Sequence, residues 1–383
     1  MAAVHGVRAL LSLHRSALFQ RSFGLIPVQL TSTCLPTRLC SATTKRNKAR
    51  PEQKNCNKSL LENLHLMGVD VEMARQRQPG VFRRKSLTNE QGLAEFLQSK
   101  GASSEEIASI ISRFPRAITR STEHLEERWE LWRKILNTDS EMLSVLERSP
   151  ESFFRSSDNK NFENIITFLT SLGFKTKDLQ RLLVKAPRIF CGSLDLTRQK
   201  VNFLKDICVE LGGTNPEQFT KTVLYKNVFI FSESIKRIRT NIDILRAYLG
   251  LGNSEMLAFI QGSAAKILVL STEYLQNNLN SVELKMVSLG CQKADIQKLF
   301  YTYPVVLYIS PATLSPKLEC LLKVGIKVEQ ILETPRVLDY STQNILGRLE
   351  QLQEVEYNFQ KNGIGILDCS QKRFLAKMEK LKL

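Results

Sequence analysis

The sequence predicts an all-α protein: a helical-repeat superhelix, or α-solenoid, of about eight to nine units, each marked by a proline. Two observations predict this fold class. A phrase of Pro followed by large apolar residues recurs at intervals of 31 to 41 residues. On both sides of it, apolar residues recur every three or four positions, which is the period of an α-helix. Strand-like alternation of apolar and polar residues is not sustained anywhere in the chain.

Residues 1–51 are predicted to be a mitochondrial transit peptide and linker. They contain eight Lys and Arg residues but no Asp or Glu, and their apolar residues are mixed with Ser and Thr. A basic amphipathic segment of this composition is typical of mitochondrial targeting, with a disordered basic tail as the alternative. A secretory signal fits less well because His14, Arg15 and Arg21 interrupt the apolar stretch. We therefore expect a protein of the mitochondrial matrix.

Residues 60–383 are predicted to form the repeat domain. The phrases QRQPGVF, SRFPRAI, ERSPESFF, VKAPRIF, TYPVVL and ETPRVL mark it at Pro79, Pro115, Pro150, Pro187, Pro304 and Pro335. Two degenerate copies keep the spacing, with Val228 and Ala265 in the place of Pro. Proline lacks an amide donor and its ring clashes with the preceding turn, so each phrase should break a helix. One unit is then a helix, a short turn and a longer second helix, which buries its apolar face only by stacking on its neighbours.

The helices on either side of each phrase carry signals of their own. Leu125, Trp129, Trp132 and Leu136 lie at helical spacing and form one apolar face. Segments such as SSEEIASII, DSEMLSVL and NPEQFTKTV supply capping residues and acids that favour a helix N-terminus. Residues 60–67 and 344–383 are less regular, and we expect them to cap the two ends of the array.

The charge distribution favours an anionic partner. The chain has 54 Lys and Arg against 38 Asp and Glu, a net charge of +16. Basic residues recur just before or after the Pro position, at Arg113, Arg116, Arg148, Lys185, Arg188, Lys226 and Arg336. Stacked repeats would align them in a stripe that suits a phosphate backbone, and arginine can also read guanine in the major groove. The alternative is that these side chains are solvated or pair with acids such as Glu147 and Glu333.

Aromatic residues also fill the apolar slot after the Pro. They are Phe153, Phe154, Phe190, Phe229, Phe231 and Tyr308. Most of them are expected to lie in the core, although an aromatic ring facing a nucleic acid can stack on a base.

Enzymatic chemistry is not predicted. The four His and eight Cys residues show no metal-ligand or C-x-x-C spacing, and the cysteines are expected to be free thiols. No glycine-rich phosphate loop or nucleophile elbow occurs. No window approaches eighteen uninterrupted apolar residues, which is the length that indicates a membrane-spanning helix. We therefore expect no catalytic residue, no metal, no cofactor and no membrane association.

Several segments resemble the mitochondrial transcription termination factors. They are GVDVEMARQRQPGVF, KGASSEEIASIISRFPRAITR, ERWELWRKI and LERSPESFFR, and the resemblance runs from about residue 60 to the C-terminus. It implies a left-handed helical array that binds duplex DNA within the mitochondrial leucine tRNA gene and terminates transcription just beyond the ribosomal RNA genes. It also implies partial unwinding of the DNA with nucleotides everted. Such a factor would act in the mitochondrial nucleoid, and a monomer would be long enough to follow the groove.

Positions that match the family's motifs imply the DNA-binding residues. Arg148 in LERSP, Phe229 in KNVFI and Tyr274 in LSTEY would stabilise everted bases. The arginines implied as base readers or backbone anchors are Arg155, Arg188, Arg237, Arg336 and Arg373. The copies at 228 and 262–265 lack the family's Pro, which leaves the local backbone open near two of the base-stabilising residues. Two other functions stay open: binding of structured ribosomal RNA during ribosome biogenesis, and a protein-recruiting scaffold.

Overall fold

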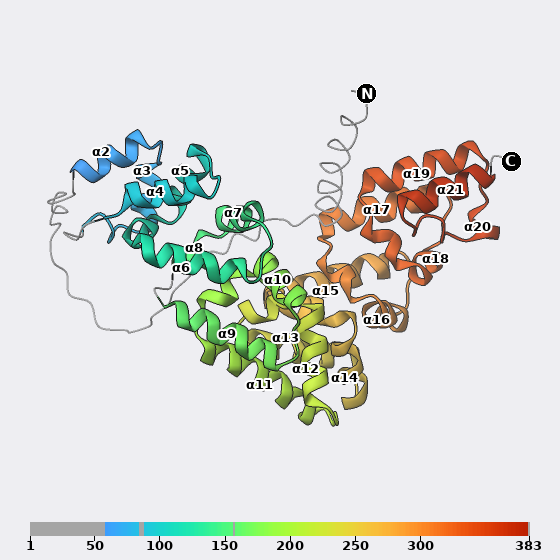
Figure 1. The fold of residues 1–383 in the computed structure, drawn as a ribbon. Helices are drawn as coiled ribbons and strands as arrows, with labels where there is room; N and C mark the ends of the chain where they lie inside the picture. The colour runs from blue at the N-terminus through green and yellow to red at the C-terminus, as the bar shows by residue number, and fades with distance from the viewer. Residues whose placement is uncertain (1–57, 84–87, 156–157, 382–383) are drawn as a thin grey trace, which may run out of the picture. The chain divides into compact units, whose positions relative to one another are not determined.

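The computed structural model describes residues 58–83, 88–155 and 158–381, so the predicted transit peptide lies outside the described residues. Every regular element in these ranges is an α-helix or a 3-10 helix, and they contain no strand (Figure 1). The all-α prediction is confirmed. The chain divides into two compact units, with the boundary between Val269 and Leu270. A single repeat domain over 60–383 stays a prediction.

The unit that ends at Val269 alternates a first helix, a short turn and a second helix. After α2 (Lys58–Leu66), the first helices are α3 (Val71–Arg77), α5 (Ser104–Arg113), α7 (Asp139–Arg148), α10 (Thr176–Lys185), α12 (Pro216–Lys226) and α14 (Asn253–Gln261). The turns are η1 (Pro115–Thr119), α8 (Pro150–Phe154), η2 (Pro187–Cys191), η3 (Val228–Ser232) and η4 (Ser263–Val269). The second helices are α4 (Glu90–Ser99), α6 (Thr122–Arg133), α9 (Asn159–Ser171), α11 (Leu194–Glu210) and α13 (Ile235–Leu249). Second helices pack in sequence, α4 on α6, α6 on α9 and α9 on α11, as stacked repeats require (Figure 1).

The unit that begins at Leu270 continues the same order. Its second helices are α15 (Thr272–Ser288), α17 (Pro311–Lys323), α19 (Thr342–Glu354) and α21 (Gln371–Leu381). Its first helices are α16 (Lys293–Thr302), α18 (Val328–Glu333) and α20 (Phe359–Asn362), and its turns are η5 (Pro304–Tyr308) and η6 (Pro335–Asp339). A last turn follows α20, and there the amide of Leu367 donates to the carbonyl of Ile364 at 2.9 Å. The C-terminal stretch therefore contains a further repeat copy, in which Ile364 stands in the place of Pro.

A ladder of polar side chains, all buried except the half-buried Lys200, joins six of the nine second helices of the described chain to the next repeat. The ladder residue lies seven positions after the Ser that precedes the helix, for example Asn278 after Ser271 and Lys317 after Ser310. The bonds to backbone carbonyls run from Arg128 to Asp158, Lys200 to Phe231, Asn241 to Leu268, Asn278 to Leu307, Lys317 to Leu338 and Arg348 to Leu367. Burial lowers the pKa of Lys317, and it lowers the pKa of Arg128 to about 10. Except for Asp158, which precedes α9, the acceptors lie three residues after the Pro position. Carbonyls at this place in a short turn lack helical partners, so these donors fix the turn against the preceding helix.

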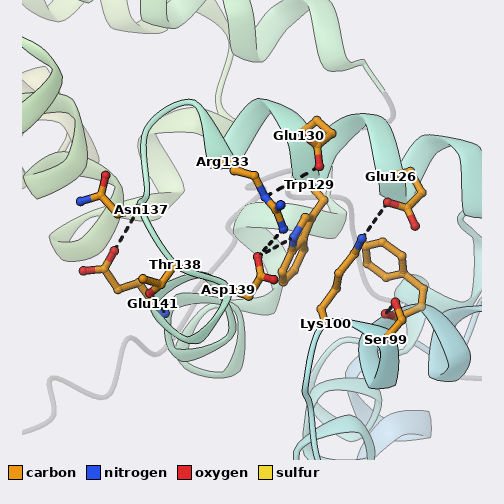
Figure 2. A network of polar contacts seen from close by, with 11 residues as sticks. Ser99, Lys100, Glu126, Trp129, Glu130, Arg133, Asn137, Thr138, Asp139 and Glu141 are labelled. Atoms are coloured by element: carbon orange, nitrogen blue, oxygen red, sulfur yellow. Dashed lines mark hydrogen bonds and ion pairs between the residues drawn. The ribbon is translucent and has the colours of Figure 1, made fainter.

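Polar side chains also close over the aromatic core between α4, α6 and α7 (Figure 2). Trp129 is fully buried, as its helical spacing predicted, and its Nε1 donates to Oδ1 of Asp139 at 3.2 Å. The Nη2 of Arg133 binds the same carboxylate oxygen at 2.6 Å. The ammonium of Lys100 lies 5.8 Å from the centre of the Trp129 ring and 2.9 Å from Glu126. These contacts satisfy the indole and tie three helices to one buried ring.

Candidate nucleic-acid interface

Most turns of the repeat present the residue after the Pro position to solvent, whereas Glu151 and Val305 at that position are half-buried. In η2, Pro187, Ile189 and Phe190 are buried, whereas Arg188 is exposed. A 3-10 helix has three residues per turn, so its first and fourth residues share one side; here that side faces the core and the second residue points away. The same position exposes Arg116, Phe229, Lys266 and Arg336 in other repeats.

The turns of the unit that ends at Val269 pack directly on one another, in the order η1, α8, η2, η3 and η4. The residues that directly follow the Pro position, or its substitute, therefore succeed one another along the stacked turns. We call this set the turn row, and it consists of Arg116, Glu151, Arg188, Phe229 and Lys266. Three cations suit a phosphate backbone and an exposed ring suits a base, so the row has the chemistry of a nucleic-acid interface.

Basic residues two positions before the Pro hold neighbouring repeats together. The bonds run from Arg113 to the carbonyls of Glu147 and Arg148, from Arg148 to Val184 at 3.0 Å, and from Lys226 to Gln261 at 2.5 Å. The acceptors lie at or near the C-terminal end of the next repeat's first helix, where carbonyls lack helical partners and the helix dipole favours cations. Arg148 nevertheless stays exposed. Backbone carbonyls, rather than the carboxylate of Glu147, are therefore the partners of Arg113.

Three of the predicted DNA-contacting arginines are each held by a carboxylate. Arg188 lies 2.5 Å from Glu151, Arg336 lies 3.8 Å from Asp368, and Arg237 pairs with Glu233. Burial raises the pKa of Asp368, and the charge of Arg336 opposes that rise.

Arg155 and Arg373 are exposed, and neither side chain forms a hydrogen bond or ion pair with any described residue. Arg155 caps the C-terminus of α8. Its charge opposes the rise that burial causes in the pKa of the Cys191 thiol. Arg373 lies in the first turn of α21. Both guanidinium groups are accessible to an anionic ligand.

The aromatic residues of the apolar slot separate into two groups, as predicted. Four are buried, namely Phe153, Phe154, Phe190 and Phe231. Phe229 is 45% exposed and Tyr308 is 39% exposed. Asn227 fixes the backbone beside the exposed phenylalanine, because its Oδ1 accepts from the Phe229 amide at 3.1 Å and its Nδ2 donates to the Ala265 carbonyl at 2.8 Å. The bonds of Asn227 therefore fix this turn although position 228 carries Val in place of Pro.

Tyr274 is half-buried at the start of α15. Its hydroxyl donates to the carbonyl of Tyr308 at 2.9 Å. Burial raises the pKa of Tyr308 to about 12, and the neighbouring Tyr274 adds to the rise. The hydrogen bond from Tyr274 thus joins the start of α15 to the end of η5, in the unit that begins at Leu270.

The structure places the predicted residues in both units. Arg188 and Phe229 lie on adjacent turns, in the same unit as Arg148, Arg155 and Arg237. Tyr274, Arg336 and Arg373 lie in the other unit. Lys266 was not among the predicted site residues, although the copy at Ala265 places it directly after the marker position. An alignment of this degenerate copy with the intact copies would have identified Lys266 from the sequence.

Within the described ranges, no three His, Cys, Asp or Glu side chains lie close enough together to hold a metal ion. No helix there is both long and apolar enough to cross a membrane. The cysteines of the described chain are free thiols, at positions 191, 208, 291, 320 and 369.

These features define the class: an α-helical repeat protein whose short turns carry a basic, partly aromatic row. Residues 61–375 match the mTERF family model, and the chain belongs to the mTERF family. It is 47% identical to human mitochondrial transcription termination factor 1 over 325 aligned residues. These residues make up 85% of this chain and 81% of the human protein. The rat factor 1 is 45% identical over 338 residues, 87% of this chain and 90% of the rat protein. Human mitochondrial transcription termination factor 2 is 28% identical over 360 residues, 90% of this chain and 92% of that protein.

The resemblance seen in the repeat motifs is therefore confirmed, and the chain is a homologue of mitochondrial transcription termination factor 1. The relatives are named as transcription termination factors, which agrees with the prediction that the chain is not an enzyme.

Proposed function

We propose that this protein binds duplex mitochondrial DNA in a sequence-specific manner and terminates transcription. The proposed site lies in the mitochondrial leucine tRNA gene, downstream of the ribosomal RNA genes. The protein acts as a monomer in the nucleoid of the mitochondrial matrix. The mitochondrial names of its relatives and the acid-free sequence of residues 1–51 support this location.

The turn row is the observation that carries the proposal. Alternate turns of the row, η1, η2 and η4, present Arg116, Arg188 and Lys266 at one repeat position, and a polyanion with regularly spaced phosphates can contact cations arranged in this way. Arg155, exposed beside the row, adds a further cation. The names of the relatives favour DNA over ribosomal RNA as the ligand.

Base eversion is part of the proposal. Phe229 is an aromatic side chain exposed between cationic neighbours, and Tyr274 is partly exposed in the other unit. An everted base loses its stacking partners, and an aromatic face replaces about 1 to 3 kcal/mol of that energy. Arg148 would complete the group of base-stabilising residues, since its guanidinium remains exposed while it bonds to Val184.

Footprinting of the protein lacking residues 1–51 on whole mitochondrial DNA tests the proposal. We expect one dominant protected site in the leucine tRNA gene, with the affinity falling steeply as salt rises. A parallel titration uses folded mitochondrial ribosomal RNA, which proteins read by shape and 2′-hydroxyl contacts. Tighter binding to that RNA, or protection without a preferred DNA site, would overturn the proposal. Light scattering of the complex measures whether one chain binds one duplex.

A further inference from the structure

Three ion pairs differ from the others in how their carboxylates are buried. The acids Glu151, Glu233 and Asp368 are 19%, 19% and 20% exposed. In the other ion pairs of the described residues the acid is 40% to 82% exposed. All three covered acids hold a predicted DNA-contacting arginine. Their partners Arg188, Arg237 and Arg336 are 58%, 36% and 70% exposed, so in each pair the acid lies inside and the guanidinium faces out.

The Arg188 pair shows what this geometry leaves available. Both Nε and Nη2 of Arg188 lie 2.5 Å from Oε1 of Glu151. The guanidinium carries its donors on a rigid planar fork, so the carboxylate occupies one edge and leaves the edge formed by Nη1 and Nη2 for a ligand. That outer edge has the two parallel donors that match O6 and N7 of guanine. The other two pairs differ in detail: Nε of Arg336 lies 3.8 Å from Oδ1 of Asp368, a looser contact, and Arg237 pairs with Glu233 through Nη1.

Glu151 is also the one acid of the turn row. At the equivalent position the neighbouring turns carry Arg116 and Arg188, and a carboxylate there weakens the attraction for phosphate. Instead, Glu151 fixes the orientation of the Arg188 side chain in the next repeat. An unpaired arginine sampling many rotamers binds any phosphate within reach, whereas a held one satisfies only a ligand placed at its outer edge.

We propose that Glu151, Glu233 and Asp368 are positioning residues that set the discrimination between matching and non-matching DNA. Each acid orients one arginine and lowers its attraction for phosphate, so the arginine contributes to a correct base contact more than to general binding. This inference rests on the proposed function. It adds three residues that do not themselves touch DNA.

The test measures binding of Glu151→Gln to two duplexes over a range of salt concentrations. One duplex carries the site found by footprinting, and the other is a scrambled sequence of equal length and composition. We expect the variant to bind the scrambled duplex about three- to tenfold more tightly, with a salt slope steeper by about one unit, because one more cation reaches phosphate. Discrimination should fall by the same factor. Glu151→Asp keeps the charge and should retain most of the discrimination.

Glu210→Gln is the matched control. Glu210 lies 2.6 Å from Arg239, so the variant removes the same charge and frees an arginine outside the turn row. It should change discrimination by less than about twofold. In an Arg188→Ala background, Glu151→Gln should have no more effect than the control, since Glu151 acts through Arg188. Thermal unfolding of each variant checks the fold, and Asp368→Asn repeats the test at Arg336.

The outcomes separate the two proposals. If the unaltered protein does not distinguish the two duplexes, both the proposed function and this inference are overturned. If the unaltered protein discriminates but Glu151→Gln and Asp368→Asn do so equally well, the inference alone is overturned. An equal loss of discrimination in Glu210→Gln would also overturn it, because general charge would then explain the effect.

Discussion

The buried ammonium of Lys317 in α17 donates to the carbonyl of Leu338 in η6 at 2.7 Å. One repeat earlier, Asn278 makes the equivalent bond to Leu307, also at 2.7 Å. In each case the acceptor lies three residues after the Pro that opens the turn. The residue one position after that Pro, the half-buried Val305 in η5 and the exposed Arg336 in η6, therefore lies on a turn that the preceding second helix anchors. The same hydrogen bonds therefore stabilise the packing of the repeats and fix the position of the residues after the Pro.

Asn278→Ala should lower the free energy of unfolding by about 1 to 3 kcal/mol, because it leaves the buried Leu307 carbonyl without this donor. Urea unfolding followed by circular dichroism measures the change. Asn277→Ala is the control, since Asn277 is exposed on the same helix and its loss should cost at most about 0.5 kcal/mol. Equal effects of the two variants would contradict the anchoring role of the ladder.

Tyr303 should make the protein lose stability at high pH. Burial, followed by its hydrogen bond to the Asp339 carboxylate and the charge of that group, raises the pKa of Tyr303 above its ordinary value. The folded state therefore keeps the proton after the unfolded chain has lost it. The stabilisation is fully present below about pH 10 and is lost as the pH rises above it, by about 1.4 kcal/mol per pH unit.

Comparison of the unaltered protein with Tyr303→Phe between about pH 9 and pH 11 isolates this effect. The phenylalanine variant should lose less stability over the interval. Tyr308, whose pKa burial raises to about 12, is present in both proteins and cancels in the difference. Parallel pH profiles would show that Tyr303 does not keep its proton in the folded state.

Phe229→Ala should weaken binding to the footprinted duplex by about 1 to 3 kcal/mol, since an everted base would lose its stacking surface. A 2-aminopurine placed at successive positions of the duplex should lose its eversion signal at one of them. The fold should be little affected because the ring is 45% exposed. By contrast, Phe231 is 5% exposed, and Phe231→Ala should lower the unfolding free energy by about 3 to 5 kcal/mol. An unchanged fluorescence profile in Phe229→Ala would remove this residue from the eversion step.

Arg336→Ala should cost about 1 to 3 kcal/mol of binding and relax the preference at one base pair. Titration against duplexes with single base-pair substitutions reveals this as a loss of discrimination at one position. Lys323→Ala, an exposed cation on α17 of the same unit, is the control for charge. A uniform loss over all duplexes would assign Arg336 to the phosphate backbone.

The local features of the repeat could be predicted because they depend on neighbours in the chain. Proline at positions such as 187 ends one helix and opens the turn, and the two apolar residues after it are buried. The ladder was missed even though it has a sequence signal, a Ser followed seven residues later by Lys, Arg or Asn. That signal is weak in a single copy, because a mid-helix Asn or Lys ordinarily faces solvent. It becomes informative when the repeats are aligned.

The sequence by itself determined the helices, the turns and the repeat position of each cation, because backbone propensity and proline chemistry act over a few residues. Only the tertiary structure decided what each side chain does at its position. Arg148 bonds to Val184 of the next repeat, whereas Arg155 finds no such acceptor among the described residues, and Phe231 is buried where Phe229 is exposed. These differences depend on where the carbonyls and apolar surfaces of an adjacent repeat lie, and those positions exist only once the repeats have packed.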